Sequence, residues 1–194
     1  MKTETGRPIF LLGHKVNLRP FRREDIPALT RWINDPEIRD FILVFLPQSE
    51  NQEEEWFKAL GKDDKSVVLA IETKDGILIG SMGLHDIRWK DRIATTGAII
   101  GEKDYWGKGY GTDAKMTLLN YAFNGLNLYK ICSSVISFNK RSLKYNLRCG
   151  YQIEGIRKRN IFKRGRYWDV VMLAVFKKDW LPLWKMYLKT GKSK

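Results

Sequence analysis

The sequence contains few of the residues that build metal sites and disulfide frameworks. Among 194 residues there are two cysteines, Cys132 and Cys149, and two histidines, His14 and His85. The cysteines give neither a disulfide framework nor a metal-ligand spacing, so we expect free thiols and no metal site. Free thiols are typical of a reducing compartment, and we therefore expect a cytoplasmic protein.

Long hydrophobic runs are also missing. The longest apolar run near the middle of the chain, Phe41 to Pro47, is far shorter than the ~18 residues that a transmembrane helix needs. The first six residues lack the apolar segment of a secretory signal. The sequence therefore predicts neither a membrane span nor a cleaved leader.

Acidic residues are scarce relative to basic ones. The chain has 22 Asp and Glu against 35 Lys and Arg, a net charge of +13. A field of this sign attracts phosphate, nucleotides, nucleic acid or acidic membranes, and it argues against a site for polycations. A hydrophobic content of 43% and an aromatic content of 12% are enough for a core. The length favours a single domain over 1–194, with a core of about 15–177 and a basic C-terminal segment at 178–194.

Hydrophobic periodicity predicts an α/β (α+β) domain. Its first half contains a strand, two helices and an antiparallel meander of three strands. Its second half contains a glycine-rich loop, a helix, a buried strand, a capped helix, a hairpin and a short amphipathic end. The predicted strands cover 15–19, 66–73, 77–87, 93–101, 130–137, 151–162 and 167–176; the predicted helical segments cover 24–33, 50–60, about 111–124, 139–148 and 180–188.

The glycine-rich loop, Tyr105-Trp-Gly-Lys-Gly-Tyr-Gly-Thr112, lies between a predicted strand and a predicted helix. A backbone without Cβ atoms approaches an anion closely, and the N-terminus of the following helix favours phosphate. An ordinary tight turn is the alternative. A Walker loop is excluded because Gly109 rather than Ser or Thr follows Lys108. A dinucleotide fingerprint is excluded because Thr112 replaces its third glycine and the loop follows a meander.

A second segment, Asn139-Lys-Arg-Ser142, opens a helix that ends at Arg148-Cys-Gly-Tyr151. Asn139 is suited to cap the N-terminus of this helix, and Gly150 is suited to end it. The segment follows the glycine loop by about thirty residues. The order of elements is therefore meander, glycine loop, helix, strand, capped helix and strand pair.

With these motifs in this order, the sequence resembles the GNAT superfamily of N-acetyltransferases, in the branch of the ribosomal-protein N-terminal and spermidine acetyltransferases. The resemblance extends from Val16 to about Phe176. It implies a mixed, mostly antiparallel sheet of six to seven strands with about four helices, whose fourth and fifth strands splay apart. The segments that carry it are Gly97–Glu102, Tyr105–Ala114, Tyr121-Ala-Phe, Leu126-Asn-Leu, Asn139–Ser142, Cys149-Gly-Tyr, Glu154-Gly and Gly165–Asp169.

The resemblance implies acetyl-CoA as the donor and places it in the cleft between the splayed strands. Backbone groups of Ala98, Ile99 and Ile100 are expected to pair with the pantetheine arm, while Asn139 and Ser142 approach the pantetheine and the thioester. Amides of the loop are expected to cradle the pyrophosphate. The loop residues assigned to acetyl-CoA are Trp106, Gly107, Lys108, Gly109, Tyr110, Gly111 and Thr112.

The implied reaction is direct attack of a neutral amine on the thioester, with a backbone N–H near Ile100 as the oxyanion donor. Two positions depart from the family pattern. Relatives often carry a Glu base at the position of Thr95 and a Tyr acid at that of Asn146. Here Tyr145 precedes that position and points about 100° around the helix. We expect Ser142 and Asn146 to hydrogen-bond the sulfur or a water.

The missing Glu favours an acceptor amine of low pKa. A lysine-type amine, with a pKa of ~10.4, is almost fully protonated at pH 7, whereas an α-amine, with a pKa of ~7.7–8, is about a tenth neutral. A thiol with a pKa of ~8.5 leaves tolerably without an acid. The candidate bases are Glu102, Glu154 and His85.

The last predicted hairpin is strongly basic, since six of the ten residues 157–166 are Lys or Arg. In this family the hairpin borders the acceptor side of the cleft. Its charge suits either a solvated surface or a contact with RNA, an acidic protein or a phosphorylated acceptor. Three hypotheses follow: acetyl transfer to a protein α-amine, such as that of a ribosomal protein; transfer to a small amine such as a nucleotide-linked amino sugar, with a polyamine disfavoured by the charge; or a non-catalytic acetyl-CoA- or RNA-binding module. A monomer and a homodimer both stay open.

Overall fold

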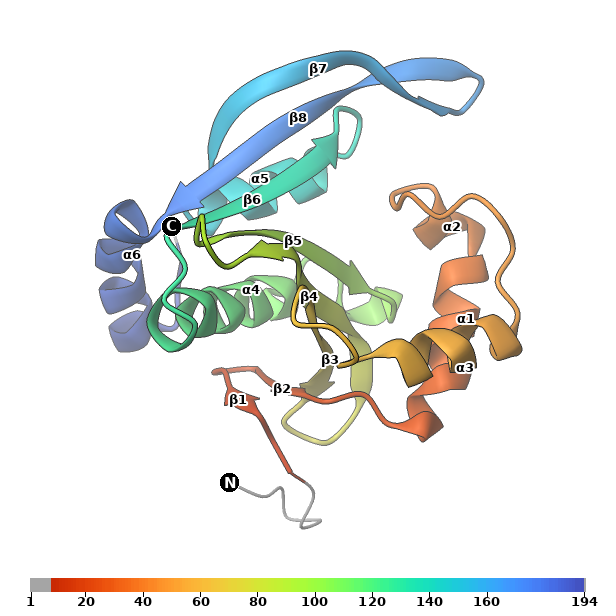
Figure 1. Cartoon of the computed structure of the whole chain (residues 1–194), viewed down its shortest axis with the longest axis horizontal. Coiled ribbons are helices and arrows are strands. Elements are labelled where there is room, and N and C mark those ends of the chain that lie inside the picture. Colours follow the sequence, from red (N-terminus) through yellow and green to blue (C-terminus); the bar gives the residue numbers. More distant parts are fainter. Residues whose placement is uncertain (1–7, 194) are drawn as a thin grey trace.

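The structure, a computed structural model, describes residues 8–193. One sheet of eight strands runs through this part of the chain in the order β1-β2-β3-β4-β5-β6-β8-β7 (Figure 1). Neighbouring strands are antiparallel except β5 and β6, which are parallel. The strands are β1 (Leu11–Leu12), β2 (Val16–Arg19), β3 (Val67–Thr73), β4 (Leu78–Arg88), β5 (Ile93–Ile100), β6 (Lys130–Ile136), β7 (Gln152–Lys163) and β8 (Arg166–Phe176).

Helices cover both faces of the sheet (Figure 1). On one face α4, α5 and α6 form the larger core, which contains Met116, Phe123 and Trp180. On the other face α1 and α3 form a second core around Trp32 and Phe21. The helices are α1 (Ile26–Asn34), α2 (Pro36–Arg39), α3 (Glu50–Ala59), α4 (Tyr110–Asn120), α5 (Lys140–Arg148) and α6 (Lys177–Thr190), and a π-helical turn (Tyr121–Gly125) extends α4.

Asp113, in the first turn of α4, joins three distant parts of the chain. Its carboxylate accepts hydrogen bonds from the backbone N–H groups of His14 (3.0 Å), Lys15 (2.7 Å) and Val16 (2.8 Å). It also accepts one from the Tyr187 hydroxyl of α6. The side chain is 1% exposed. Asp113 therefore holds the β1–β2 turn and the C-terminal helix against the start of α4.

The predicted α/β architecture is confirmed, with differences in the counts. The sheet has eight strands rather than six to seven, and residues 8–193 contain six α-helices rather than about four. The additional strand, β1, is two residues long, and the additional α2 is a single turn capped by Asp35. Neither is long enough to show a hydrophobic period. The final helix is also longer than the predicted 180–188.

No helix within residues 8–193 has both the length and the apolar character needed to cross a membrane.

Candidate active site

The candidate site lies where β5 and β6 separate. Their parallel pairing covers three residue pairs and ends at Thr95 and Cys132. Beyond that point β5 continues to Ile100 while β6 stays paired with β8 up to Ile136. Ala98, in the middle of the free stretch of β5, is exposed. The predicted splay is therefore present and leaves one edge of β5 available for an added strand-like partner.

The apex of this fork contains a buried lysine. Thr96, the first residue of β5 beyond the pairing, donates its hydroxyl hydrogen to the Cys132 carbonyl at 3.2 Å. The same hydroxyl oxygen accepts a hydrogen bond from Lys115 Nζ of α4 at 2.7 Å and lies 2.9 Å from the Tyr151 hydroxyl. The ammonium also lies 5.2 Å from the ring centroids of Tyr145 and Tyr151. Burial lowers the pKa of Lys115 to about 8.

The glycine loop joins β5 to α4 in a shape suited to phosphate. Gly107 and Gly109 have φ values of 74° and 87°, in the left-handed region that favours glycine. Gly109 is the N-cap of α4, so the N-terminus of that helix opens into the loop. Lys15 Nζ donates to the Lys108 carbonyl at 3.0 Å, which brings a cation to the loop. Nothing in the local sequence around Lys15 predicts this position.

The first turn of α5 forms the opposite wall of the fork. Asn139 caps it, since its side-chain oxygen accepts a hydrogen bond from the Ser142 N–H at 3.0 Å. Asn146 is 2% exposed and donates its amide to the Ser142 carbonyl at 2.9 Å, while its Oδ1 is buried without a hydrogen-bond partner. An orphaned buried acceptor beside Ser142 is consistent with a polar ligand group at this point.

Tyr145 lies on a different side of α5. Its hydroxyl is buried without a hydrogen-bond partner, and its ring lies beside Gly111, where a Cβ would be 3.9 Å away. Burial raises the pKa of Tyr145 well above its ordinary value. The ring therefore packs between α5 and α4, and an acid role for Tyr145 stays a prediction.

His85 of β4 occupies the other face of the sheet beside the fork. It pairs with Thr95 across the β4–β5 ladder. Its Nε2 lies over Gly83 and Gly97, where a Cβ on either glycine would be 3.1 Å from it. Burial lowers the pKa of His85 below its ordinary 6.5, so its imidazole is neutral at pH 7. A neutral imidazole can accept a proton, which Thr95 cannot.

The two carboxylates predicted as alternative bases have cationic partners. Glu102 forms an ion pair with Arg31 and accepts a hydrogen bond from Trp32 Nε1 at 3.0 Å. Both partners belong to α1, so Glu102 fastens that helix to the end of β5. Glu154 is 2.7 Å from Lys130 Nζ.

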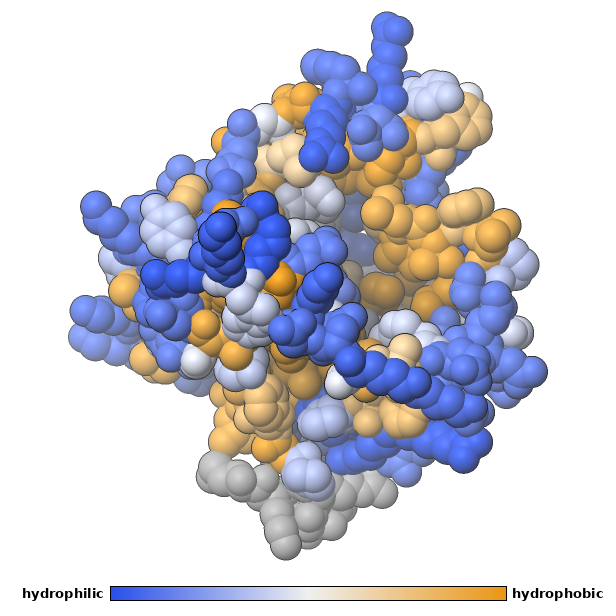
Figure 2. All heavy atoms as spheres, in the orientation of Figure 1, coloured by the Kyte–Doolittle hydropathy of each residue, from blue (hydrophilic) through white to orange (hydrophobic). Residues whose placement is uncertain are grey.

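A recess lies between the β7–β8 hairpin and the segment that follows α2. Figure 2 shows hydrophobic side chains on both sides of a hollow between these two parts. On the α2 side Leu43, Phe45 and Leu46 are 65%, 78% and 58% exposed. On the hairpin Phe162 and Tyr167 are 61% and 63% exposed. Phe162 and Tyr167 alternate along their strands with Lys163 and Trp168, which contact α2 and Phe138, so they lie on the other face of the hairpin.

Much of the hairpin's positive charge is used within the protein. Arg164 forms an ion pair with Asp40 and stacks on Phe138, with its guanidinium carbon 4.2 Å from the ring centroid. Lys163 donates to a backbone carbonyl of α2 at 2.8 Å. Lys158 lies 3.0 Å from the carboxylate of Asp169. These contacts fasten the hairpin to α2 and to itself, so they reduce the charge left for an RNA contact.

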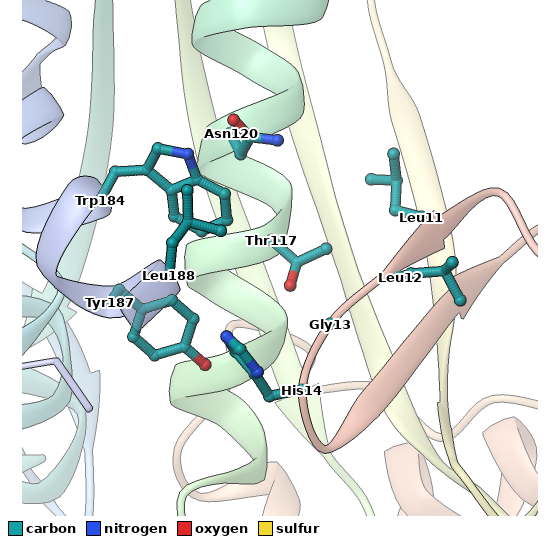
Figure 3. A pocket seen from close by; sticks show the side chains of 9 residues that line it. All are labelled: Leu11, Leu12, Gly13, His14, Thr117, Asn120, Trp184, Tyr187 and Leu188. Atoms are coloured by element: carbon teal, nitrogen blue, oxygen red, sulfur yellow. The ribbon is translucent and has the colours of Figure 1, made fainter. Parts of the chain in front are cut away.

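A cavity of about 340 Å³ lies elsewhere, between the β1–β2 turn, α4 and α6 (Figure 3). His14 and Tyr187 face each other in it, with ring centroids 5.1 Å apart. None of the predicted site residues lines this cavity.

The sequence profile of the acetyltransferase (GNAT) domain matches residues 15–152, which is more than half of the chain. The chain belongs to the GNAT acetyltransferase family. It is 27% identical over 169 residues to the spermidine N(1)-acetyltransferase of Escherichia coli K12, covering 87% of this chain and 90% of the relative. It is 26% identical over 176 residues to the N-acetyltransferase p20 of Bacillus licheniformis, a protein named as uncharacterized, covering 88% and 97%.

A solved structure shows the same fold with a ligand related to the predicted donor. The Vibrio cholerae spermidine N-acetyltransferase in complex with CoA and spermine superposes with a TM-score of 0.81 at 26% identity, covering 86% of this chain and 98% of that one. The protein is thus an N-acetyltransferase, and the CoA bound by this relative supports acetyl-CoA as the donor. The left-handed glycines, the exposed edge at Ala98 and the orphaned Asn146 Oδ1 all fit that donor.

Proposed function

We propose that this GNAT acetyltransferase transfers the acetyl group to the α-amine of a protein or peptide, of which a ribosomal protein is one expected example. The observation that carries the proposal is His85 beside Thr95, where the family often has Glu. A base of pKa below 6.5 is matched to an amine whose own pKa is ~7.7–8 rather than ~10.4.

The acceptor side of the site supports the same choice. A polyamine site needs uncompensated negative charge, because its ligand is a polycation. Around the recess Asp40 pairs with Arg164, while Asp35 and Glu37 lie 2.8 and 2.7 Å from Lys103 Nζ. These carboxylates already have cationic partners.

In the proposed mechanism His85 is the base, the fork holds the thioester, and the glycine loop holds the pyrophosphate. Acetyl-CoA supplies the acetyl group as a thioester. The neutral amine nitrogen forms a bond to the acetyl carbonyl carbon, the C–S bond breaks, and His85 takes the amine proton, directly or through a water. Lys15 and the N-terminus of α4 hold the pyrophosphate, and Ser142 and Asn146 offer hydrogen-bonding groups near the sulfur.

A small-amine activity is the second candidate, because two of the relatives described above are spermidine acetyltransferases. The test is a thiol-release assay with acetyl-CoA on three acceptors: lysine-free peptides with a free α-amine, the same peptides with the α-amine blocked and one lysine added, and spermidine. Mass spectrometry locates the acetyl group. We expect the free α-amine to be the preferred acceptor. A kcat/KM for spermidine that exceeds that of every peptide refutes the proposal.

The base is tested by the pH profile. The acceptor amine and His85 must both be neutral, so kcat/KM falls below the amine pKa of ~7.7–8 and falls twice as steeply once the His85 imidazole is protonated as well. We expect His85→Gln to lose most of kcat, on the order of 10²-fold, and to lose the steeper part of this acidic limb while keeping the part that comes from the amine. His14→Gln, which changes the other histidine far from the fork, is the matched control. An unchanged acidic limb in His85→Gln excludes His85 as the base.

A further inference from the structure

Besides Lys115, a second basic residue lies between the donor fork and the acceptor recess. Arg141 follows Asn139 and Lys140 in the first turn of α5. Its guanidinium carbon lies 3.9 Å from the ring centroid of Trp106, in the glycine loop, and 5.5 Å from that of Phe41, which follows α2. The side chain therefore spans from the donor wall to the acceptor side of the opening.

Trp106 is itself held in place, which makes the stack a fixed platform. Its Nε1 donates to the Ile100 carbonyl at the end of β5, at 2.7 Å. Its ring packs with Ile99 against the second core. A guanidinium that lies flat on an indole leaves its N–H edge free to face an anion.

Arg141 has no acidic partner among residues 8–193, unlike three other cations around the opening. Arg164, Arg31 and Lys103 each form an ion pair with a carboxylate. Arg141 makes only ring contacts, and burial lowers its pKa with no carboxylate to offset the cost. A guanidinium that is held against two rings at the opening and has no carboxylate partner keeps N–H groups available for an external anion.

We infer that Arg141, stacked on Trp106, is a specificity-determining anion subsite for the acceptor, and that it selects a primary amine with a carboxylate nearby. The inference rests on the proposed function and refines it: in a peptide acceptor the carboxylate belongs to an acidic residue directly after the N-terminal one. Arg141 binds this carboxylate through its N–H edge, and the amine then lies close to the fork.

The test compares two lysine-free peptides that differ only in a second residue of Glu or Gln. For the unmodified enzyme we expect kcat/KM to be about two- to fivefold higher with Glu, the size of a partly exposed ion pair. In Arg141→Gln the ratio falls to about one, mainly through KM, while acetyl-CoA affinity measured by calorimetry is unchanged. Arg148→Gln removes the same charge from the last turn of α5 and keeps the ratio.

Two results overturn the inference. One is a Glu-to-Gln ratio near one in the unmodified enzyme. The other is an Arg141→Gln variant that keeps the ratio but binds acetyl-CoA about tenfold more weakly, which assigns Arg141 to the donor.

Failure of the proposed function gives a different result. If no peptide is acetylated while small amines are, the peptide proposal is wrong, and the subsite is judged on glutamic acid α-amide against glutamine α-amide. A preference for the acid that disappears in Arg141→Gln supports the subsite, and equal rates in the unmodified enzyme refute it.

Discussion

Replacing Lys115 with methionine tests whether the ammonium at the apex of the fork is held there at a cost. Methionine has a similar length and no charge, so it fills the same space in the core. Four neighbours face Lys115 Nζ: Thr96 from β5, Tyr145 from α5, and Cys149 and Tyr151 just after that helix. No carboxylate contacts the ammonium among the described residues.

The magnitude follows from the pKa of Lys115. The pKa of Lys115 is about 8 in the folded protein, against 10.5 for an ordinary lysine, so folding lowers it by about 2.5 pH units. At about 1.4 kcal/mol per unit, the charge costs about 3 kcal/mol at pH 7. The hydrogen bond to Thr96 returns about 1 kcal/mol. We therefore expect Lys115→Met to unfold with a free energy about 2 kcal/mol larger than that of the unmodified protein at pH 7.

The difference in unfolding free energy between the two proteins falls to about zero at high pH. Between about pH 8 and 10.5 the unfolded chain binds more protons at this lysine than the folded one does, so the unfolding free energy rises with pH. Relative to Lys115→Met, the unmodified protein therefore regains about 2–3 kcal/mol between pH 7 and 10.

Urea unfolding of both proteins at pH 7, 8, 9 and 10 measures this difference. Burial raises the pKa of Cys149 to about 12 and also raises those of Tyr145 and Tyr151, but these groups are common to both proteins and largely cancel in the difference. A difference in unfolding free energy that stays constant with pH refutes the reasoning. An ammonium that keeps its ordinary pKa in the core gives that result.

Two further substitutions test the donor side. Asp113→Asn leaves one carbonyl oxygen for four donors. Because each lost acceptor costs about 1–3 kcal/mol, we expect the unfolding free energy to fall by about 2–5 kcal/mol and the Tm measured by calorimetry to fall by about 5–15 °C. A loss under ~1 kcal/mol contradicts the role of this carboxylate. Gly109→Asp puts a side chain at φ 87° and a negative charge beside the predicted pyrophosphate site, so we expect acetyl-CoA to bind at least about tenfold more weakly in calorimetry. Gly76→Asp, at φ 81° in the β3–β4 turn, carries the same backbone strain and is expected to keep the affinity; equal affinities in both variants contradict the loop assignment.

Local signals predicted the parts of the site that depend on local geometry. Asn139 was predicted as a helix cap and is one, and Gly150, predicted to end that helix, has a φ of 94°. The glycine loop lies between a strand and a helix as predicted, and Gly107 and Gly109 adopt the left-handed backbone that favours glycine there. Capping and left-handed turns need only a few neighbouring residues, so a single sequence contains them.

Contacts between distant residues could not be predicted in this way. Arg164 and Asp40 are 124 positions apart, and no periodicity links the hairpin to α2. Lys115 is buried although lysine is usually exposed, so the sequence pattern of α4 did not predict its burial. The proposal of His85 as the base, among three candidates, depends on its pairing with Thr95 across the sheet, which the sequence alone does not give.

The hairpin also forms one boundary of the sheet. β7 is twelve residues long, occupies the end of the strand order, and exposes Ile153 and Ile156 by 52% and 51%. A long, unpaired strand edge with exposed apolar residues is a template for pairing between copies of a chain.

Two features of β7 oppose that pairing. The register shifts between Arg157 and Ile161, and Arg159 within this bulge has a φ of 48°, which bends the edge. The run of cations there repels the same run on another copy. We therefore expect the enzyme to precipitate when the Arg and Lys residues of its hairpin are replaced. Its loss of activity would then result from insolubility rather than from a damaged site.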